Sequence, residues 1–268
     1  MLSRVAVFLS QHTPRGLKSY VHKVRFLDNS LMSLYGTLLT NSVLVIKDGP
    51  LSGMELAADR HTSHAHINGT YERDVQDAID RMVKPGDVCY DLGASIGYMS
   101  LVMARKAKHV YSFEPSPNAI AEMERHIAAN ALQNVTIVPS PVSGTVKEVR
   151  FCVTDVAYGS SINETETKWP ALRLTTTTVD LFAKDHEPPD FMKIDVEGEE
   201  GAVLDGARRT LGRRKTKICC EIHNQEAARS VLAILKEFDY DVRLMDGSPA
   251  EVPQEVLPGE FHVLASPR

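Results

Sequence analysis

Short apolar runs alternate with amphipathic stretches over most of this chain. The runs predicted to form strands are 87–91, 109–113, 135–138, 191–196, 217–223, 240–245 and 261–264. Apolar residues spaced three and four positions apart predict helices at 97–107, at 116–130 and in the segments that end at 211 and 238. Strands that alternate with helices are typical of an α/β fold with a doubly wound, mostly parallel sheet, here of seven strands. Such a sheet binds its ligands beyond the carboxyl ends of the strands.

The first 70 residues follow a different pattern and are expected to form an extension before a domain at 71–268. Residues 15–40 have a helical pattern, and the apolar runs 43–46 and 54–56 flank the turn residues Asp48-Gly49-Pro50, which predicts a hairpin. We expect this extension to act as a lid over the domain or to mediate a homodimer.

Two further segments complete the expected domain. An amphipathic helix is predicted over 71–83, with Thr70 as its N-cap. The insertion at 145–180 is rich in Thr and Ser and is predicted to be an antiparallel flap, built on strands at 149–153 and 174–179.

Composition and charge narrow the choice of partners. The chain has 268 residues, a formal net charge of -5 and a pI near 6.1, so a polyanionic partner is not expected. No aromatic residues interleave with the basic residues between 208 and 217, which also argues against nucleic acid. The apolar run 5–9 is too short for a secretory signal or a membrane span, so stable membrane insertion is not expected. The basic character of residues 1–27 fits a packed or solvated helix better than a targeting segment.

The chain contains four cysteines, at positions 89, 152, 219 and 220. None of them has the spacing of a zinc site. Buried free thiols in a reducing compartment are the simplest interpretation, and we expect a cytoplasmic location.

The most informative segment is the glycine turn after the first strand of the domain, Asp91 to Ser100. An apolar run ends on Asp91, and Gly93 and Gly97 then lead into a helix, an arrangement that holds a nucleoside ligand against backbone amides. Glu114 ends the next strand, where an acid reaches ribose hydroxyls. A dinucleotide site needs glycine at the position of Ser95, so a ligand without pyrophosphate, such as S-adenosylmethionine, fits better. The alternative is an ordinary structural turn.

A second group of polar residues lies at the ends of two later strands. Alternation along the strand places Lys193, Asp195 and Glu197 on one side, and it also places Glu221 and His223 together. This group supports general-base chemistry, a divalent cation held by Asp195, Glu197, Glu221 and His223, or a structural network. In the structural network, Lys193 neutralises Asp195, and Glu197 or Glu199 caps the next helix. We favour the base.

Three histidines, His61, His64 and His66, lie close together in the sequence. No fourth ligand stands at the spacing of a known metal site, so we predict an irregular, exposed loop and no metal. The alternative is that His66 lines a pocket.

Several motifs together resemble the FkbM family of S-adenosylmethionine-dependent methyltransferases. They are Asp91-x-Gly93-x-x-x-Gly97-Tyr98, Phe113-Glu114-Pro115, Val179-Asp180 and Lys193-Ile194-Asp195-Val196-Glu197-Gly198-x-Glu200. Upstream, Gly49-Pro50-Leu51-x-Gly53 and Gly69-Thr70-Tyr71-Glu72 are similar to the lead-in of that family. The resemblance covers residues 48–223, and Ser95 stands where the family usually carries Asn.

The resemblance implies a class I, Rossmann-like methyltransferase fold and O-methylation of a small molecule such as a sugar or polyketide. It implies that Asp91, Gly93 and Gly97 hold the methionine part of S-adenosylmethionine, that Glu114 holds the ribose, and that Glu72 lies near the pocket. The full set of expected cofactor residues is Glu72, Asp91, Gly93, Ser95, Gly97, Tyr98, Glu114 and Asp195.

A hydroxyl is a poor nucleophile until its proton leaves, so an O-methyltransferase needs a base or a metal at the acceptor. We predict that His223 or Asp195 takes the proton and that Glu197 and Glu221 orient the acceptor. A divalent metal is not favoured.

Three rival functions remain. N-methylation of a small molecule or of a nucleic acid base is the nearest, but the Asn/Asp-Pro-Pro-aromatic string of base methyltransferases is replaced here by Asp195-Val196-Glu197-Gly198. A non-catalytic sensor or scaffold that binds the cofactor is the second, and a dehydrogenase, weakened by Ser95, is the third.

Overall fold

The computed structural model describes residues 42–58, 62–153, 161–162, 170–253 and 261–268. The chain divides into two compact units, one formed by residues 1–73 and 124–131 and the other by 74–123 and 132–268. The predicted helix at 15–40 and the basic segment 1–27 lie outside the described residues, as does His61.

The first unit contains the predicted hairpin. Strands β1 (Val43–Val45) and β2 (Glu55–Ala57) pair in antiparallel register, which confirms that prediction. The side chain of Asn130 holds the outer edge of β2, because it donates to the Glu55 carbonyl at 2.7 Å and accepts from the Glu55 amide at 2.8 Å.

The prediction of an exposed, irregular loop at His64 and His66 is wrong. Both residues belong to helix α4 (His64–Asn68), and the His66 side chain is buried. The cause is a capping box, in which the Ser63 hydroxyl accepts from the His66 amide while the His66 ring bonds to the Ser63 amide. Burial, with a contribution from His126, lowers the pKa of His66 to about 4, so this imidazole is neutral at physiological pH.

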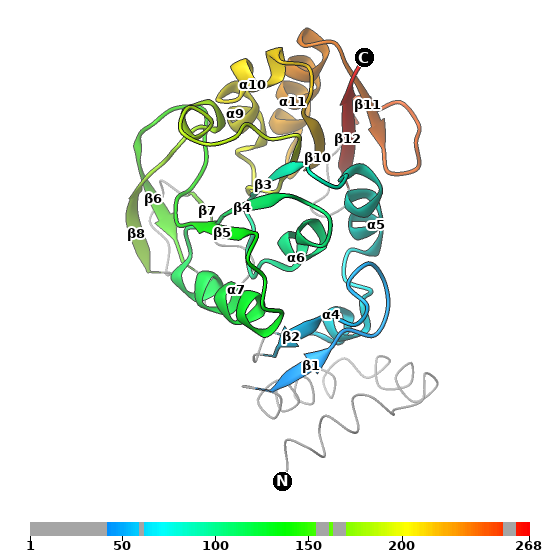
Figure 1. Ribbon diagram of the computed structural model, residues 1–268. Coiled ribbons are helices and arrows are strands. Elements are labelled where there is room, and N and C mark those ends of the chain that lie inside the picture. Colours follow the sequence, from blue (N-terminus) through cyan, green and yellow to red (C-terminus); the bar gives the residue numbers. More distant parts are fainter. Residues whose placement is uncertain (1–41, 59–61, 154–160, 163–169, 254–260) are drawn as a thin grey trace, which may run out of the picture. The chain divides into compact units, whose positions relative to one another are not determined.

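The second unit is built on a seven-stranded sheet with the order β11-β12-β10-β9-β3-β4-β5 (Figure 1). Its strands are β3 (Val88–Leu92), β4 (His109–Phe113), β5 (Val135–Val138), β9 (Phe191–Ile194), β10 (Lys217–Glu221), β11 (Tyr240–Leu244) and β12 (His262–Pro267). Neighbours from β10 to β5 run parallel, and only β12 is antiparallel to the strands beside it. The predicted doubly wound, mostly parallel sheet is therefore confirmed.

Most of the helices around this sheet lie where helices are predicted, but the single helix predicted to end at 211 forms two helices. The helices are α5 (Arg73–Met82), α6 (Tyr98–Ala104), α7 (Pro117–Ala129), α8 (Val179–Phe182), α9 (Glu200–Asp205), α10 (Arg208–Gly212) and α11 (Gln225–Glu237). Helix α5 begins at Arg73, two residues later than predicted. Within the described part of the chain, no helix has both the length and the apolar character needed to cross a membrane.

Alternation along the central strands separates the core from the site. Tyr90 and Ile194 point to the face covered by α9, α10 and α11 and belong to one large apolar cluster (Figure 1). Asp91 and Lys193 point to the opposite face, where Asp91 meets Ser100 of α6. The large apolar cluster thus packs on one face of the sheet, while charged groups lie buried on the other.

The flap differs from its prediction in one strand. It is a three-stranded sheet of β7 (Ser161–Ile162), β6 (Glu148–Cys152) and β8 (Ala171–Thr175). The predicted strand at 174–179 is wrong, because β8 ends at Thr175 and Thr178 then caps α8 by accepting from the Leu181 amide at 3.0 Å.

Candidate active site

The glycine turn between β3 and α6 lies directly against the end of β9. Gly93 has φ +82°, and a β-carbon on it would lie 1.7 Å from the Asp195 carbonyl oxygen. Gly97 has φ +80°, and its β-carbon would lie 2.4 Å from Met123 Cγ. These positions therefore need glycine for both backbone conformation and space. The close approach brings the two predicted groups of site residues together.

Asp91, at the start of this turn, is a fully buried carboxylate. Its Oδ2 accepts from the Ser100 hydroxyl at 2.5 Å, and Ser112 Oγ lies 2.8 Å from the same hydroxyl. Its Oδ1 has no hydrogen-bond partner among the described residues. Burial raises the pKa of Asp91 and the charge of Lys193 opposes that shift, so a positively charged donor at Oδ1 would stabilise the ionised form.

Glu114, at the end of β4, closes the other side of the turn. Its two carboxylate oxygens accept from the Ser95 amide at 2.9 Å and from the Ser116 amide at 2.7 Å. Ser95, whose amide makes the first of these bonds, has φ +49°, a left-handed backbone conformation. Burial raises the pKa of Glu114 to about 7, although both backbone hydrogen bonds oppose that shift.

This carboxyl makes a testable contribution to the pH dependence of folding. Glu114 keeps its proton up to about pH 7 in the native state, whereas its ordinary pKa is 4.5. Stability therefore falls as pH rises through that window, because the unfolded chain has already released the proton. Between about pH 5 and pH 7 the free energy of unfolding of the wild type should fall by roughly 2 to 3 kcal/mol more than that of Glu114→Gln. Urea unfolding at both pH values measures this difference. An unchanged pH slope in the variant would contradict the assignment.

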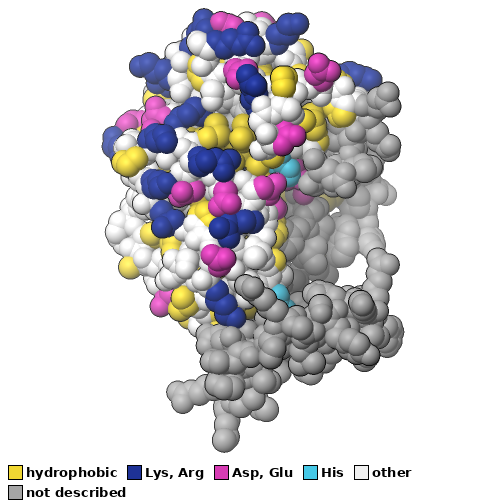
Figure 2. Space-filling model, turned by 90° about the vertical axis from the view of Figure 1, so that its right-hand side faces the viewer, with side chains coloured by type: hydrophobic (Ala, Val, Ile, Leu, Met, Phe, Trp, Pro, Cys, Tyr) yellow, Lys and Arg dark blue, Asp and Glu magenta, His cyan; other side chains and the backbone are white. Residues whose placement is uncertain are grey.

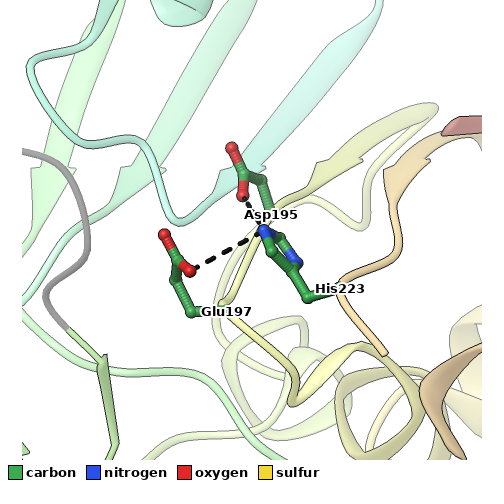
Figure 3. A group of neighbouring side chains, drawn as sticks. All are labelled: Asp195, Glu197 and His223. Carbon is green, nitrogen blue, oxygen red and sulfur yellow. Dashed lines mark ion pairs between the residues drawn. The ribbon is translucent and has the colours of Figure 1, made fainter. Parts of the chain in front are cut away.

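His223 lies at the centre of the second group of residues, just after β10. Its Nε2 lies 3.6 Å from Asp195 Oδ1, 3.8 Å from Glu197 Oε2 and 3.5 Å from Glu221 Oε1 (Figure 3 shows the first two contacts). Its Nδ1 lies 2.8 Å from Oε1 of Glu200, which is fully buried. We call Asp195, Glu197, Glu200, Glu221 and His223 the carboxylate cluster.

The electrostatics of this cluster favour a protonated histidine. Burial alone would lower the pKa of His223, but the hydrogen bond to Glu200 and the surrounding negative charges outweigh burial and raise it to about 9. Burial raises the pKa of Glu197, against the effect of the imidazolium. The cluster at neutral pH is therefore an imidazolium surrounded by carboxylates.

Asp195 is also paired with a lysine, as the structural interpretation of the sequence predicts. Lys193 Nζ donates to Asp195 Oδ2 at 2.8 Å, and Lys193 is itself buried. The Asp195 side chain is 24% exposed, so a second molecule can reach it. Glu199 occupies the N-cap position of α9, one of the two positions predicted, but its side chain makes no capping bond and accepts from the Ser143 hydroxyl instead. The Gly198 amide donates to Glu200.

The structure adds two residues that the sequence analysis did not predict. Glu200 lies behind His223, and His262 on β12 lies 3.2 Å from Glu221 Oε2 through its Nε2. Glu200 was visible only as the last residue of a family motif, and nothing in the local pattern marks His262. Both contacts join residues from different elements of the fold.

Two predicted cofactor residues are not placed among these groups. Tyr98 is the first residue of α6 and is buried. Glu72 belongs to the first compact unit and has φ +40°, so its position near the pocket remains a prediction.

Comparisons with known proteins point to one family. The family model described as the methyltransferase FkbM domain matches residues 91–242. Hexuronic acid methyltransferase AglP of Haloferax volcanii is 25% identical over 167 residues, which cover 62% of this chain and 68% of AglP. The tRNA (guanine(37)-N(1))-methyltransferase Trm5b of Pyrococcus abyssi is 32% identical over 69 residues, which cover 26% of this chain and 20% of Trm5b.

A solved structure of methyltransferase FkbM from Methylobacillus flagellatus is 16% identical, with a TM-score of 0.45, and the match covers 75% of this chain and 53% of that one. This chain spans a third or less of the length of the first curated relatives that it matches.

Proposed function

The chain belongs to the FkbM family of methyltransferases, and from this we propose that it transfers a methyl group from S-adenosylmethionine to a hydroxyl of a small molecule. One observation supports this proposal above the others. The backbone of Asp195 packs against the glycine turn, while its side chain faces His223 in the carboxylate cluster. The residues to which we assign the cofactor and the proton acceptor are therefore adjacent.

The residues around the turn fit S-adenosylmethionine. The buried Asp91 oxygen that has no partner among the described residues suits a cationic ammonium group. The Glu114 carboxylate suits ribose hydroxyls, which can donate to its remaining lone pairs. Because Gly93 has no side chain, the Asp195 carbonyl can approach the turn closely. When bound, the cofactor supplies a methyl group on a sulfonium.

In this proposal Asp195 accepts the proton that the acceptor hydroxyl loses as its oxygen takes the methyl group. His223 is the weaker of the two predicted acceptors at neutral pH, because it already carries a proton. The positive charge of His223 instead stabilises the ionised forms of Glu197 and Glu221. Glu197 and Glu221, which both face His223 Nε2, would orient the acceptor.

The class of acceptor is part of the proposal. The relative AglP is a hexuronic acid methyltransferase, so a sugar hydroxyl is our first choice. The similarity to Trm5b keeps a tRNA base as the rival acceptor. On the face shown in Figure 2, Lys and Arg side chains are interspersed with Asp and Glu.

The proposal also includes a reducing compartment such as the cytoplasm, because all four cysteines are free thiols.

Calorimetry with S-adenosylhomocysteine tests the cofactor, with NAD as the control ligand. We expect one-to-one binding at micromolar or tighter affinity, followed by methylation of at least one member of a panel of free sugars, uronic acids and polyketide alcohols. Binding without turnover on this panel and on tRNA would support a sensor or scaffold instead. No binding by a folded protein would remove the basis of the proposal.

Removal of divalent metal is expected to leave the activity unchanged. Among the described residues, Asp195, Glu197 and His223 form a group that could hold a metal, because their ligand atoms lie within 4.8 Å of one another. A cation would, however, have to displace the proton of His223, whose pKa is raised to about 9. The measurement is turnover after exhaustive treatment with a chelator. A loss of activity that Mg²⁺ or Mn²⁺ restores would show that a metal replaces the base.

A further inference from the structure

The last strand of the sheet brings a second histidine to the carboxylate cluster. Strand β12 runs antiparallel to β10, and their register places His262 directly opposite Glu221. His262 lies beyond residues 91–242, the part of the chain that the family model matches. It is therefore not one of the residues that the family match assigns.

His262 and His223 share the carboxylate of Glu221. His262 Nε2 lies 3.2 Å from Glu221 Oε2, and both side chains are about one-tenth exposed. The other oxygen, Oε1, lies 3.5 Å from His223 Nε2, which is longer than a good hydrogen bond. His262 of β12 thus holds Oε2 of Glu221, while Oε1 faces His223 without a close hydrogen bond to it.

This arrangement favours the ionised form of Glu221. Although burial favours the neutral acid, the hydrogen bond from His262 and the positive charges nearby lower the pKa of Glu221. The imidazolium of His223 attracts the same carboxylate, together with those of Asp195, Glu197 and Glu200. Without the bond to His262, nothing on β12 would oppose the closing of Glu221 onto His223.

We propose that His262 is a positioning residue, which holds Glu221 away from His223 so that Oε1 can accept a hydrogen bond from the acceptor. The inference rests on the proposed function, because it assigns Glu221 to the acceptor. It predicts that the loss of His262 weakens acceptor binding without slowing the chemistry. A uniform loss of binding raises KM and leaves kcat unchanged.

The test compares His262→Leu with His262→Gln, whose side-chain amide can replace the Nε2 donor. The acceptor is whichever member of the sugar and uronic acid panel the wild-type protein methylates. For His262→Leu we expect a rise in the KM for that acceptor of about tenfold, with kcat and S-adenosylhomocysteine affinity within about twofold of wild type. His262→Gln should restore most of the KM.

Crystal structures of the same three proteins give a readout that does not depend on turnover. In His262→Leu the Glu221 carboxylate should move onto His223, with an O to N distance of about 2.8 Å. The matched control is His109→Leu, which removes a histidine bonded to Thr136 Oγ1 at 2.9 Å at the beginning of β4. It should change neither KM nor the position of Glu221.

The outcomes separate the two proposals. A Glu221 that stays in place in His262→Leu, or a KM that does not change, overturns the role of His262. If the wild type methylates nothing on the panel, the proposed function fails, while the crystal structures still decide the role of His262. If the leucine variant does not fold, His262→Asn replaces it with the same expectation, because its shorter amide cannot reach Glu221.

Discussion

Asp195→Asn is expected to lower kcat by about 10²- to 10⁴-fold, the range typical of removing a general base. The variant keeps an oxygen that can accept from Lys193, so the buried lysine retains a partner at the present distance of 2.8 Å. It cannot accept the proton of the acceptor hydroxyl. The measurement is steady-state methylation of the acceptor identified by the panel, together with calorimetry for S-adenosylhomocysteine, whose affinity should stay within about threefold.

Two companion variants make this result specific. Glu199→Gln changes a neighbouring acid whose side chain bonds to Ser143 and not to His223, so it should retain near wild-type turnover. His223→Gln separates the two predicted proton acceptors. If His223→Gln abolishes turnover while Asp195→Asn is close to wild type, the assignment of the base to Asp195 is wrong.

Gly93→Ala is expected to destabilise the protein by about 2 to 5 kcal/mol. It should also weaken S-adenosylhomocysteine binding by roughly tenfold or more. Two costs combine at this position. A residue with a β-carbon is strained at φ +82°, and that β-carbon would overlap the Asp195 carbonyl, whose oxygen would lie 1.7 Å away. Relief of the overlap requires the turn to move away from the end of β9, which would displace both Asp91 and Asp195.

Gly86→Ala is the matched control, because it separates strain from overlap. Gly86 has φ +93°, but nothing lies within 4 Å of the position of its β-carbon. We expect this variant to show only the conformational cost, about 1 to 2 kcal/mol, and to bind S-adenosylhomocysteine like the wild type. Urea unfolding and calorimetry on both variants provide the comparison. Equal losses of binding in the two would contradict a tight turn at Gly93.

The pattern of apolar and polar residues correctly predicted elements that depend on nearby residues, such as a tight turn, or on regular alternation along a strand. The strands at 109–113 and 135–138 have the predicted bounds, and the hairpin formed around Gly49 as its turn residues indicate. The same patterns failed at His66 and at Thr178. In both places a side-chain cap begins a short helix, and the apolar periodicity does not report such a cap.

The sequence by itself determined the class of fold, the glycine turn and the side of each strand on which an acid lies. These features follow from alternation along a strand and from glycine at positions of left-handed backbone, which are properties of the chain over a few residues. Only the tertiary structure decided that Glu200 lies behind His223 and that His262 faces Glu221. Those contacts join residues 23 and 41 positions apart in the sequence. The raised pKa of His223 depends on carboxylates from several elements. It therefore arises only when folding brings the carboxyl ends of the strands together.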